Sequence, residues 1–124
     1  MADMEKILAA LKNLRIGMVI EEYDLQASVA EVLTAYGIAY KKEYYLGLGN
    51  RVDFMTEDGI AIEIKKGKPN RTRLINQIER YAVFDEVAGI IVVVETSLRI
   101  PPTKTISGKP CAILGLKKLW GIAL

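Results

Sequence analysis

Residues 51–66, RVDFMTEDGIAIEIKK, leave the chain few alternatives to a β-hairpin. Two runs rich in β-branched and apolar residues flank Glu57-Asp58-Gly59, and hairpin loops of three residues commonly need glycine at their left-handed position. Gly59 stands at that position. The segment therefore predicts two antiparallel strands joined by a turn centred on Asp58.

The register of this hairpin decides which side chains share a face. A turn centred on Asp58 places Asp53 opposite Glu63 and Arg51 opposite Lys65. Side chains alternate between the two faces of a strand. One face then carries Arg51, Asp53, Ala61, Glu63 and Lys65. The other, apolar face carries Val52, Phe54, Ile62 and Ile64.

Two carboxylates meet on the polar face. The Cβ atoms of Asp53 and Glu63 are expected roughly 4.5–5.5 Å apart, where like charges destabilise a sheet. A divalent cation would reverse that effect, because Mg²⁺ takes oxygen ligands and is typically held by one or two carboxylates. The alternative is a solvated strand face on which Lys65 and Arg51 balance the two acids. The hairpin alone leaves both interpretations open.

Composition restricts the kind of protein and the chemistry. A chain of 124 residues with 51% hydrophobic residues suits a single domain, residues 1–124, with its own core. The chain has no histidine, which excludes Ser-His-Asp and Cys-His triads and the usual zinc sites that contain histidine. Cys111 is the one cysteine, so we expect a small buried apolar role and a reducing, cytoplasmic environment. Charges interrupt the N-terminal segment, which predicts neither a signal peptide nor a membrane span.

The charge is small in total but unevenly distributed. A net charge of +2 and a pI near 8.6 do not by themselves mark a nucleic-acid-binding protein. However, five positive charges follow Glu63 closely, at Lys65, Lys66, Lys68, Arg71 and Arg73. Such a run is most often a solvated loop and helix start; directly after a carboxylate pair it could also bind a phosphate backbone.

Hydrophobic periodicity predicts the remaining elements. The first predicted helix has apolar positions from Met4 to Leu14 and closes near Gly17. The other two cover 21–37 and 69–87, with Asn70 as the N-cap of the third. Predicted strands cover 38–49 and 89–95, and a turn at 107–110 leads to a short strand and a final helical turn within 111–122. The buried face of the second helix is expected to comprise Leu25, Val29, Val32, Leu33 and Tyr36, with Gly37 ending the helix.

The order α, β, β, β, α, β over residues 21–95 resembles that of the PD-(D/E)XK nuclease superfamily. The motif would read Asp53, nine further residues, then Glu63-Ile64-Lys65, the only Glu-x-Lys or Asp-x-Lys in the chain. This resemblance implies an α/β, restriction-endonuclease-like αβββαβ core, in which a mixed central sheet is flanked by helices.

Two further features strengthen the resemblance. Many family members carry a glutamate on the helix before the first strand, and here Glu22 is followed by Gln26 one helical turn later. Glu21 and Glu31 compete with Glu22, which could also simply complement the helix dipole. Gln77 and Tyr81 resemble the Gln-x-x-x-Tyr signature of RecB-type nucleases, in which both side chains project toward DNA. The alternative is a solvated glutamine and a tyrosine that packs at the core edge.

The resemblance implies metal-dependent hydrolysis of phosphodiester bonds, most naturally in DNA. Mg²⁺, with Mn²⁺ able to substitute, would be held by Asp53, Glu63, the Ile64 carbonyl and Glu22, while Lys65 would complete the catalytic set. The expected nucleic-acid contacts are Gln26, Lys66, Lys68, Arg71, Arg73, Gln77, Arg80 and Tyr81. Small nucleases of this kind include junction resolvases and phage or mobile-element enzymes. Many are homodimers, and the candidate apolar contacts are Leu98, Ile100, Trp120 and Ile122.

Two other interpretations stay open. Proteins of this fold can lose catalysis and persist as nucleic-acid-binding or assembly modules, because a fold does not determine a function. The chain could also be an unrelated α/β domain with a balanced surface strand.

Overall fold

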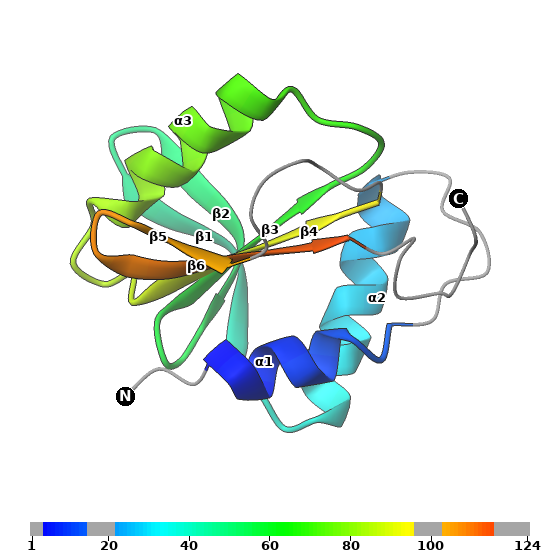
Figure 1. The fold of residues 1–124 in the computed structure, drawn as a ribbon. Coiled ribbons are helices and arrows are strands. Elements are labelled where there is room, and N and C mark those ends of the chain that lie inside the picture. The colour runs from blue at the N-terminus through cyan, green and yellow to red at the C-terminus, as the bar shows by residue number, and fades with distance from the viewer. Residues whose placement is uncertain (1–3, 15–21, 96–102, 116–124) are drawn as a thin grey trace.

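The fold is described by a computed structural model that covers residues 4–14, 22–95 and 103–115 (Figure 1). These ranges contain three helices and six strands. In chain order they are α1 (Met4–Leu11), α2 (Glu22–Ala35), β1 (Tyr40–Gly47), β2 (Asn50–Thr56), β3 (Ile60–Lys65), α3 (Arg71–Ala82), β4 (Gly89–Val94), β5 (Thr103–Ile106) and β6 (Lys109–Gly115). The predicted order α, β, β, β, α, β is confirmed from α2 to β4.

The strands form one mixed sheet in the order β1-β2-β3-β4-β6-β5. The pairs β1–β2, β2–β3 and β5–β6 are antiparallel, whereas β3–β4 and β4–β6 are parallel. Figure 1 shows α3 on one side of the sheet and α1 and α2 on the other. The buried apolar residues accordingly divide into two clusters, one under α3 and one under α1 and α2. The expected α/β class with a mixed sheet flanked by helices is therefore confirmed.

The hairpin has the predicted register. Phe54 pairs with Ile62 and Met55 with Ala61, which are the partners expected for a turn centred on Asp58. Gly59 has φ +91, and a Cβ added there would lie 2.8 Å from the carbonyl oxygen of Glu86. Both the left-handed backbone and the close packing therefore require glycine at this turn.

The predicted apolar face of the hairpin is correct except for Val52. Phe54, Ile62 and Ile64 pack in the cluster under α1 and α2, whereas Val52 packs in the cluster under α3. Strict alternation holds only along a regular strand, and here the β1–β2 pair is irregular. Glu43, which lies on β1 between the partners of Phe54 and Val52, has φ +50 and is therefore not in the extended conformation. The β2–β3 pairing also ends at Phe54, so Val52 lies beyond the regular ladder.

The second helix ends where the glycine predicted. Ile38 N–H donates to the Leu33 carbonyl at 2.9 Å, Gly37 N–H donates to the Thr34 carbonyl at 3.1 Å, and Gly37 has φ +70. This pattern is a Schellman motif. Tyr36 was expected on the buried face and is instead 49% exposed, because it follows the last residue of α2 and leaves the apolar stripe.

The third helix begins as predicted but ends early. The Asn70 side chain accepts a hydrogen bond from Arg73 N–H at 2.9 Å and caps the helix. The helix ends at Ala82 rather than at residue 87. After Ala82 the chain forms turns, in which Phe84 N–H donates to the Tyr81 carbonyl and Val87 N–H donates to the Phe84 carbonyl. Val87 is buried before β4 begins.

The C-terminal region contains a strand that the sequence reading missed. β5 pairs with β6 through the two-residue turn Ser107-Gly108, whose φ angles of +52 and +77 are typical of a type I′ hairpin turn. β5 has only four residues and directly follows Pro101-Pro102, so its side-chain alternation is too short to predict a strand. Cys111 is buried on β6, as expected. The final helical turn predicted within 117–122 and the candidate dimer residues Leu98, Ile100, Trp120 and Ile122 lie outside the described residues.

Within the three described ranges, none of the helices has the length and apolar character needed to cross a membrane.

Candidate functional site

The carboxylate pair lies where strands β2 and β3 separate. Regular pairing between them ends at Phe54 and Ile62. Beyond that point side chains replace backbone partners: Ile64 N–H donates to Asp53 Oδ2 at 2.8 Å, and Asp53 N–H donates to Glu63 Oε1 at 3.3 Å. The predicted convergence of Asp53 and Glu63 is therefore confirmed, at an opening in the sheet.

Glu63 is the most enclosed acidic side chain of this group. It is only 5% exposed, and its Oε2 atom accepts a hydrogen bond from Gln77 Nε2 at 3.1 Å. Lys65 Nζ lies 3.3 Å from the same oxygen. Glu63 and Lys65 thus lie on the α3 side of the sheet, as the alternation along β3 predicted, and Asp53 lines the same hollow as Glu63 and Gln77.

The electrostatics of the pair are unfavourable for two negative charges. Burial is the main cause that raises the pKa of Glu63, from 4.5 to about 7, and the charge of Asp53 raises it further. Lys65 lowers this pKa in part through its charge and its hydrogen bond. The positive charge of Lys65 therefore offsets the effects of burial and of Asp53 on Glu63 only in part, in contrast to a balanced strand face.

Gln77 and Tyr81, both on α3, form hydrogen bonds to this site. Gln77 Nε2 also donates to Tyr81 Oη at 2.8 Å, and the Tyr81 hydroxyl donates to the Arg51 carbonyl at 3.0 Å. Tyr81 is 2% exposed, and its pKa is raised by burial and then by the charge of Glu63. The pair therefore connects α3 to β2 and holds the Glu63 carboxylate in place. Nucleic-acid contacts by these two residues stay predictions.

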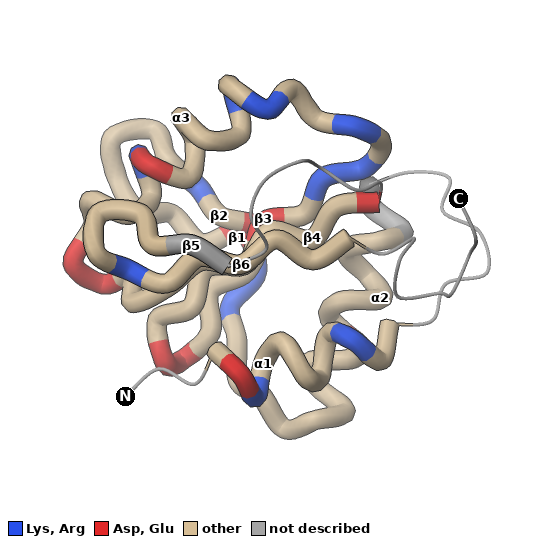
Figure 2. Tube along the Cα trace, in the orientation of Figure 1, with Lys and Arg blue, Asp and Glu red and all other residues tan. Residues whose placement is uncertain are grey.

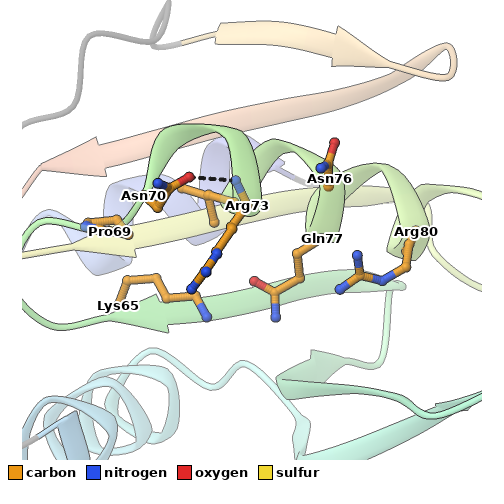
Figure 3. Close-up of a pocket in the computed structure, with 8 residues that line it drawn as sticks. Lys65, Pro69, Asn70, Arg73, Asn76, Gln77 and Arg80 are labelled. Carbon is orange, nitrogen blue, oxygen red and sulfur yellow. Dashed lines mark hydrogen bonds between the residues drawn. The ribbon is translucent and has the colours of Figure 1, made fainter.

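Two hollows adjoin the carboxylates on this side of the sheet. One, of about 480 Å³, is lined by Asp53 and Glu63 together with Tyr45, Gly49, Asn50, Arg51, Gln77, Arg80 and Tyr81. The other, of about 450 Å³, runs along α3 and shares Gln77 and Arg80 with the first. Figure 3 shows Arg73, Gln77 and Arg80 extending from α3 toward the strand that carries Lys65, whereas Asn76 points away.

The remaining predicted phosphate contacts lie between β3 and the start of α3. Figure 2 shows lysine and arginine along the connection from β3 to α3 and at the start of that helix. Lys66, Lys68 and Arg71 are exposed there. Gly67 N–H donates to Glu95 Oε1 at 3.2 Å, which ties this connection to the end of β4.

Helix α2 carries the remaining predicted site residues. Gln26 is partly exposed on a helix that covers the opposite face of the sheet from Glu63, and Glu31 on that helix is exposed. Glu22 is the first residue of α2, but its side chain and the whole of Glu21 lie outside the described residues.

The donor set can be tested against Mg²⁺. Among the described residues no group of three His, Cys, Asp or Glu side chains is placed to hold a metal ion. Mg²⁺ does not need such a cage, because one or two carboxylates with water and substrate phosphate complete its octahedron. Asp53 and Glu63 supply two carboxylates beside an open hollow, so the residues fit this ion.

Two residues of the site escaped prediction from the sequence. Asn50 Nδ2 donates to the carbonyls of Gly47 and Leu48, each at 3.3 Å, and Arg80 Nε donates to Asn50 Oδ1 at 3.2 Å. Tyr45 lines the carboxylate hollow. The run Gly-Leu-Gly-Asn at 47–50, just before the strand with Asp53, was the available signal for a tight hairpin tip beside the site.

The raised pKa of Glu63 predicts how stability depends on pH. Between about pH 4.5 and 7 the folded protein keeps a proton that the unfolded chain has lost. The free energy of unfolding of the metal-free protein should therefore fall as pH rises through this interval, by up to about 3 kcal/mol, and level off above it. Urea unfolding in EDTA at several pH values, compared between the wild type and Glu63→Gln, measures this contribution. Equal pH dependence in the two proteins would contradict it.

Searches against protein-family models, curated proteins and solved structures find no match for this chain. Its function must therefore be inferred from its own residues and their arrangement.

Proposed function

We propose that this protein is a Mg²⁺-dependent nuclease that hydrolyses phosphodiester bonds in nucleic acid, with DNA as its main substrate. The observation that carries the proposal is the meeting of Asp53, Glu63 and Lys65 where β2 and β3 separate, beside an open hollow. Burial and the charge of Asp53 disfavour a negative charge on Glu63, and the neighbouring lysine offsets this only in part. A metal ion between the acids would account for that arrangement.

The strand geometry offers a third oxygen ligand. Ile64 N–H points across the gap to Asp53, and the N–H and C=O of one strand residue point to the same edge of the strand. The Lys65 carbonyl, by contrast, accepts from Glu95 N–H on the β4 side. The Ile64 carbonyl therefore faces the gap and would join Asp53 and Glu63 as a ligand. Glu22 as a further ligand stays a prediction. The bound ion would lower the pKa of a water molecule and stabilise charge on the attacking and leaving oxygens.

Lys65 and the basic side chains supply the rest of the chemistry. Lys65 is partly exposed and lines the hollow along α3, so its ammonium group can face a phosphate there. It would orient the attacking water or stabilise the charge that develops around phosphorus. Arg73 and Arg80 line the same hollow, and with the exposed Lys66, Lys68 and Arg71 they would contact the phosphate backbone.

The topology supports a restriction-endonuclease-like core. The order α, β, β, β, α, β from α2 to β4 places Asp53 on the second strand and Glu63 and Lys65 on the third. Gln77 and Tyr81 of the RecB-type signature then follow on the next helix, where they contact Glu63 and the Arg51 backbone.

Cleavage assays with the purified protein test this proposal. The substrates are linear duplex, circular single strand, flap, four-way junction and RNA, each with Mg²⁺, with Mn²⁺ or with EDTA. Products are expected with either metal and not with EDTA, because the two carboxylates need a cation to act on phosphate. Lys65→Ala purified in parallel controls for contaminating nucleases. Nucleic-acid binding that is insensitive to metal, without cleavage of any substrate, would instead identify a silent binding module.

A further inference from the structure

The tip of the β1–β2 hairpin stands beside the carboxylate hollow. Tyr45 and Gly49 line that hollow together with Asp53 and Glu63. Leu48, between them in sequence, is 91% exposed, and its φ of +51 with the +78 of Gly49 is typical of a type I′ hairpin turn. The turn therefore holds a large apolar side chain outward, between two residues that line the carboxylate hollow.

The tip is held in place by polar contacts from its surroundings. Asn50 Nδ2 donates to the carbonyls of Gly47 and Leu48, and Arg80 Nε on α3 donates to Asn50 Oδ1. The tip is thus fastened to the same helix that carries Gln77 and Tyr81. Leu48 also borders an apolar hollow at the end of α3, beside Val83 and Phe84.

The Tyr45 ring is held by a hydrogen bond and is exposed to solvent. Its hydroxyl accepts a hydrogen bond from Gly49 N–H at 3.2 Å, which holds the ring across the tip, and the residue is still 63% exposed. An anchored aromatic ring is a surface on which bases of a single strand can stack, because every base has a π-face. Bases within an intact duplex are already stacked on one another and cannot use such a platform.

We propose that Tyr45 stacks on an unpaired base of the strand whose phosphate enters the carboxylate hollow, and that Leu48 separates this base from its neighbour. The substrate class is therefore nucleic acid with unpaired bases rather than intact duplex, an inference that rests on the proposed nuclease function for its cleavage. Arg51 and Arg80 line the hollow beside Tyr45 and can contact the phosphates of such a strand, while a metal ion would offset the charges of Asp53 and Glu63 there. An apolar protein partner would leave the two arginine charges buried against it.

Binding and cleavage by Tyr45 variants test this inference. The ligands are a single strand, a duplex of the same sequence and that duplex with a short unpaired bubble, with affinities measured by fluorescence anisotropy in EDTA and cleavage rates in Mg²⁺. The wild type should prefer the two ligands with unpaired bases. Tyr45→Ala should reduce this preference roughly 10-fold, because it removes one base–aromatic stack, and Leu48→Ala should reduce it less. Tyr45→Phe should keep most of it, because the ring stays.

Tyr36→Ala is the matched control. Tyr36 is also an exposed tyrosine, but it follows α2 in the helix layer on the opposite side of the sheet, so the preference should be unchanged. Circular dichroism and thermal unfolding of each variant confirm that it folds. If Tyr45→Ala does not fold, the other two variants test the inference. Tyr45→Phe should then keep most of the preference for unpaired bases, and Leu48→Ala should lose part of it.

The outcomes separate this inference from the nuclease proposal. Equal use of duplex and unpaired ligands by the wild type, or an equal loss on all ligands in Tyr45→Ala, would overturn the inference and leave a nuclease. A preference that depends on Tyr45 without any metal-dependent cleavage would support the inference and overturn the nuclease. A Tyr45→Ala protein with altered sedimentation mass and unaltered ligand preference would identify the tip as a contact between copies of the chain, which also overturns it.

Discussion

Replacing Glu63 with glutamine is expected to lower Mg²⁺-dependent cleavage by a factor on the order of 10³. A metal ion contributes several kcal/mol of transition-state stabilisation, and each 1.36 kcal/mol corresponds to roughly tenfold in rate. The substitution removes the charge that would hold the ion but nearly keeps the size of the side chain. An amide oxygen can still accept from Asp53 N–H or from Gln77, so the fold should persist. At pH 8 in EDTA the variant should be at least as stable as the wild type, because the buried charge of Glu63 beside Asp53 is gone.

Single-turnover cleavage and the Mg²⁺-induced shift in melting temperature measure the two halves of this prediction. Glu57→Gln is the matched control, because Glu57 is an exposed glutamate in the turn of the same hairpin and should change neither quantity. A Glu63→Gln protein that cleaves as fast as the wild type would show that the carboxylate pair is not the metal site. Unchanged Mg²⁺ stabilisation with lost cleavage would place the ion elsewhere.

The parts of the fold that the sequence predicted correctly depend on local patterns. Asp58 and Gly59 define a turn, and a turn together with alternation determines which residues pair across the hairpin. The Asn70 cap and the Gly37 stop are likewise properties of a few consecutive residues. Each of these features therefore appears in the structure at the predicted position.

The features that were wrong or missed depend on distant parts of the chain. Val52 changes cluster because of an irregularity in the neighbouring strand, which no pattern within β2 reveals. Strand β5 is four residues long and is defined by its pairing with β6. Short strands gain their stability from such partners rather than from their own propensity.

In the candidate site, too, local patterns predict some contacts, whereas others depend on distant parts of the chain. The motif spacing and alternation place Asp53, Glu63 and Lys65 together without knowledge of the helices. The contact of Gln77 with Glu63 requires α3 to dock over β3, and the network from Arg80 through Asn50 joins residues thirty apart in sequence. The burial that raises the pKa of Glu63 is also a product of this docking, so a pattern of residues could not supply it.

Replacing Lys65 with alanine is expected to separate metal binding from catalysis. Cleavage at saturating Mg²⁺ should fall by roughly 10²- to 10³-fold, the usual effect of removing one charged donor that stabilises the transition state. Mg²⁺ binding at pH 8 should persist, because both carboxylates stay in place. Below pH 7 binding should weaken relative to the wild type, since Lys65 lowers the pKa of Glu63 and its loss lets a proton compete for that carboxylate. Calorimetric titration of Mg²⁺ at both pH values, beside single-turnover cleavage, measures these effects.

Lys66→Ala is the control that makes the Lys65 result interpretable. The two lysines are adjacent in sequence but have different environments. Lys66 is exposed, whereas Lys65 contacts Glu63. Lys66→Ala should weaken nucleic-acid binding a few-fold at low salt and much less at high salt, as expected when one phosphate contact is lost. Its cleavage rate with saturating substrate should stay far above that of Lys65→Ala. Similar losses in the two variants would mean that Lys65 contributes only charge to substrate binding, and the catalytic role assigned to it would be wrong.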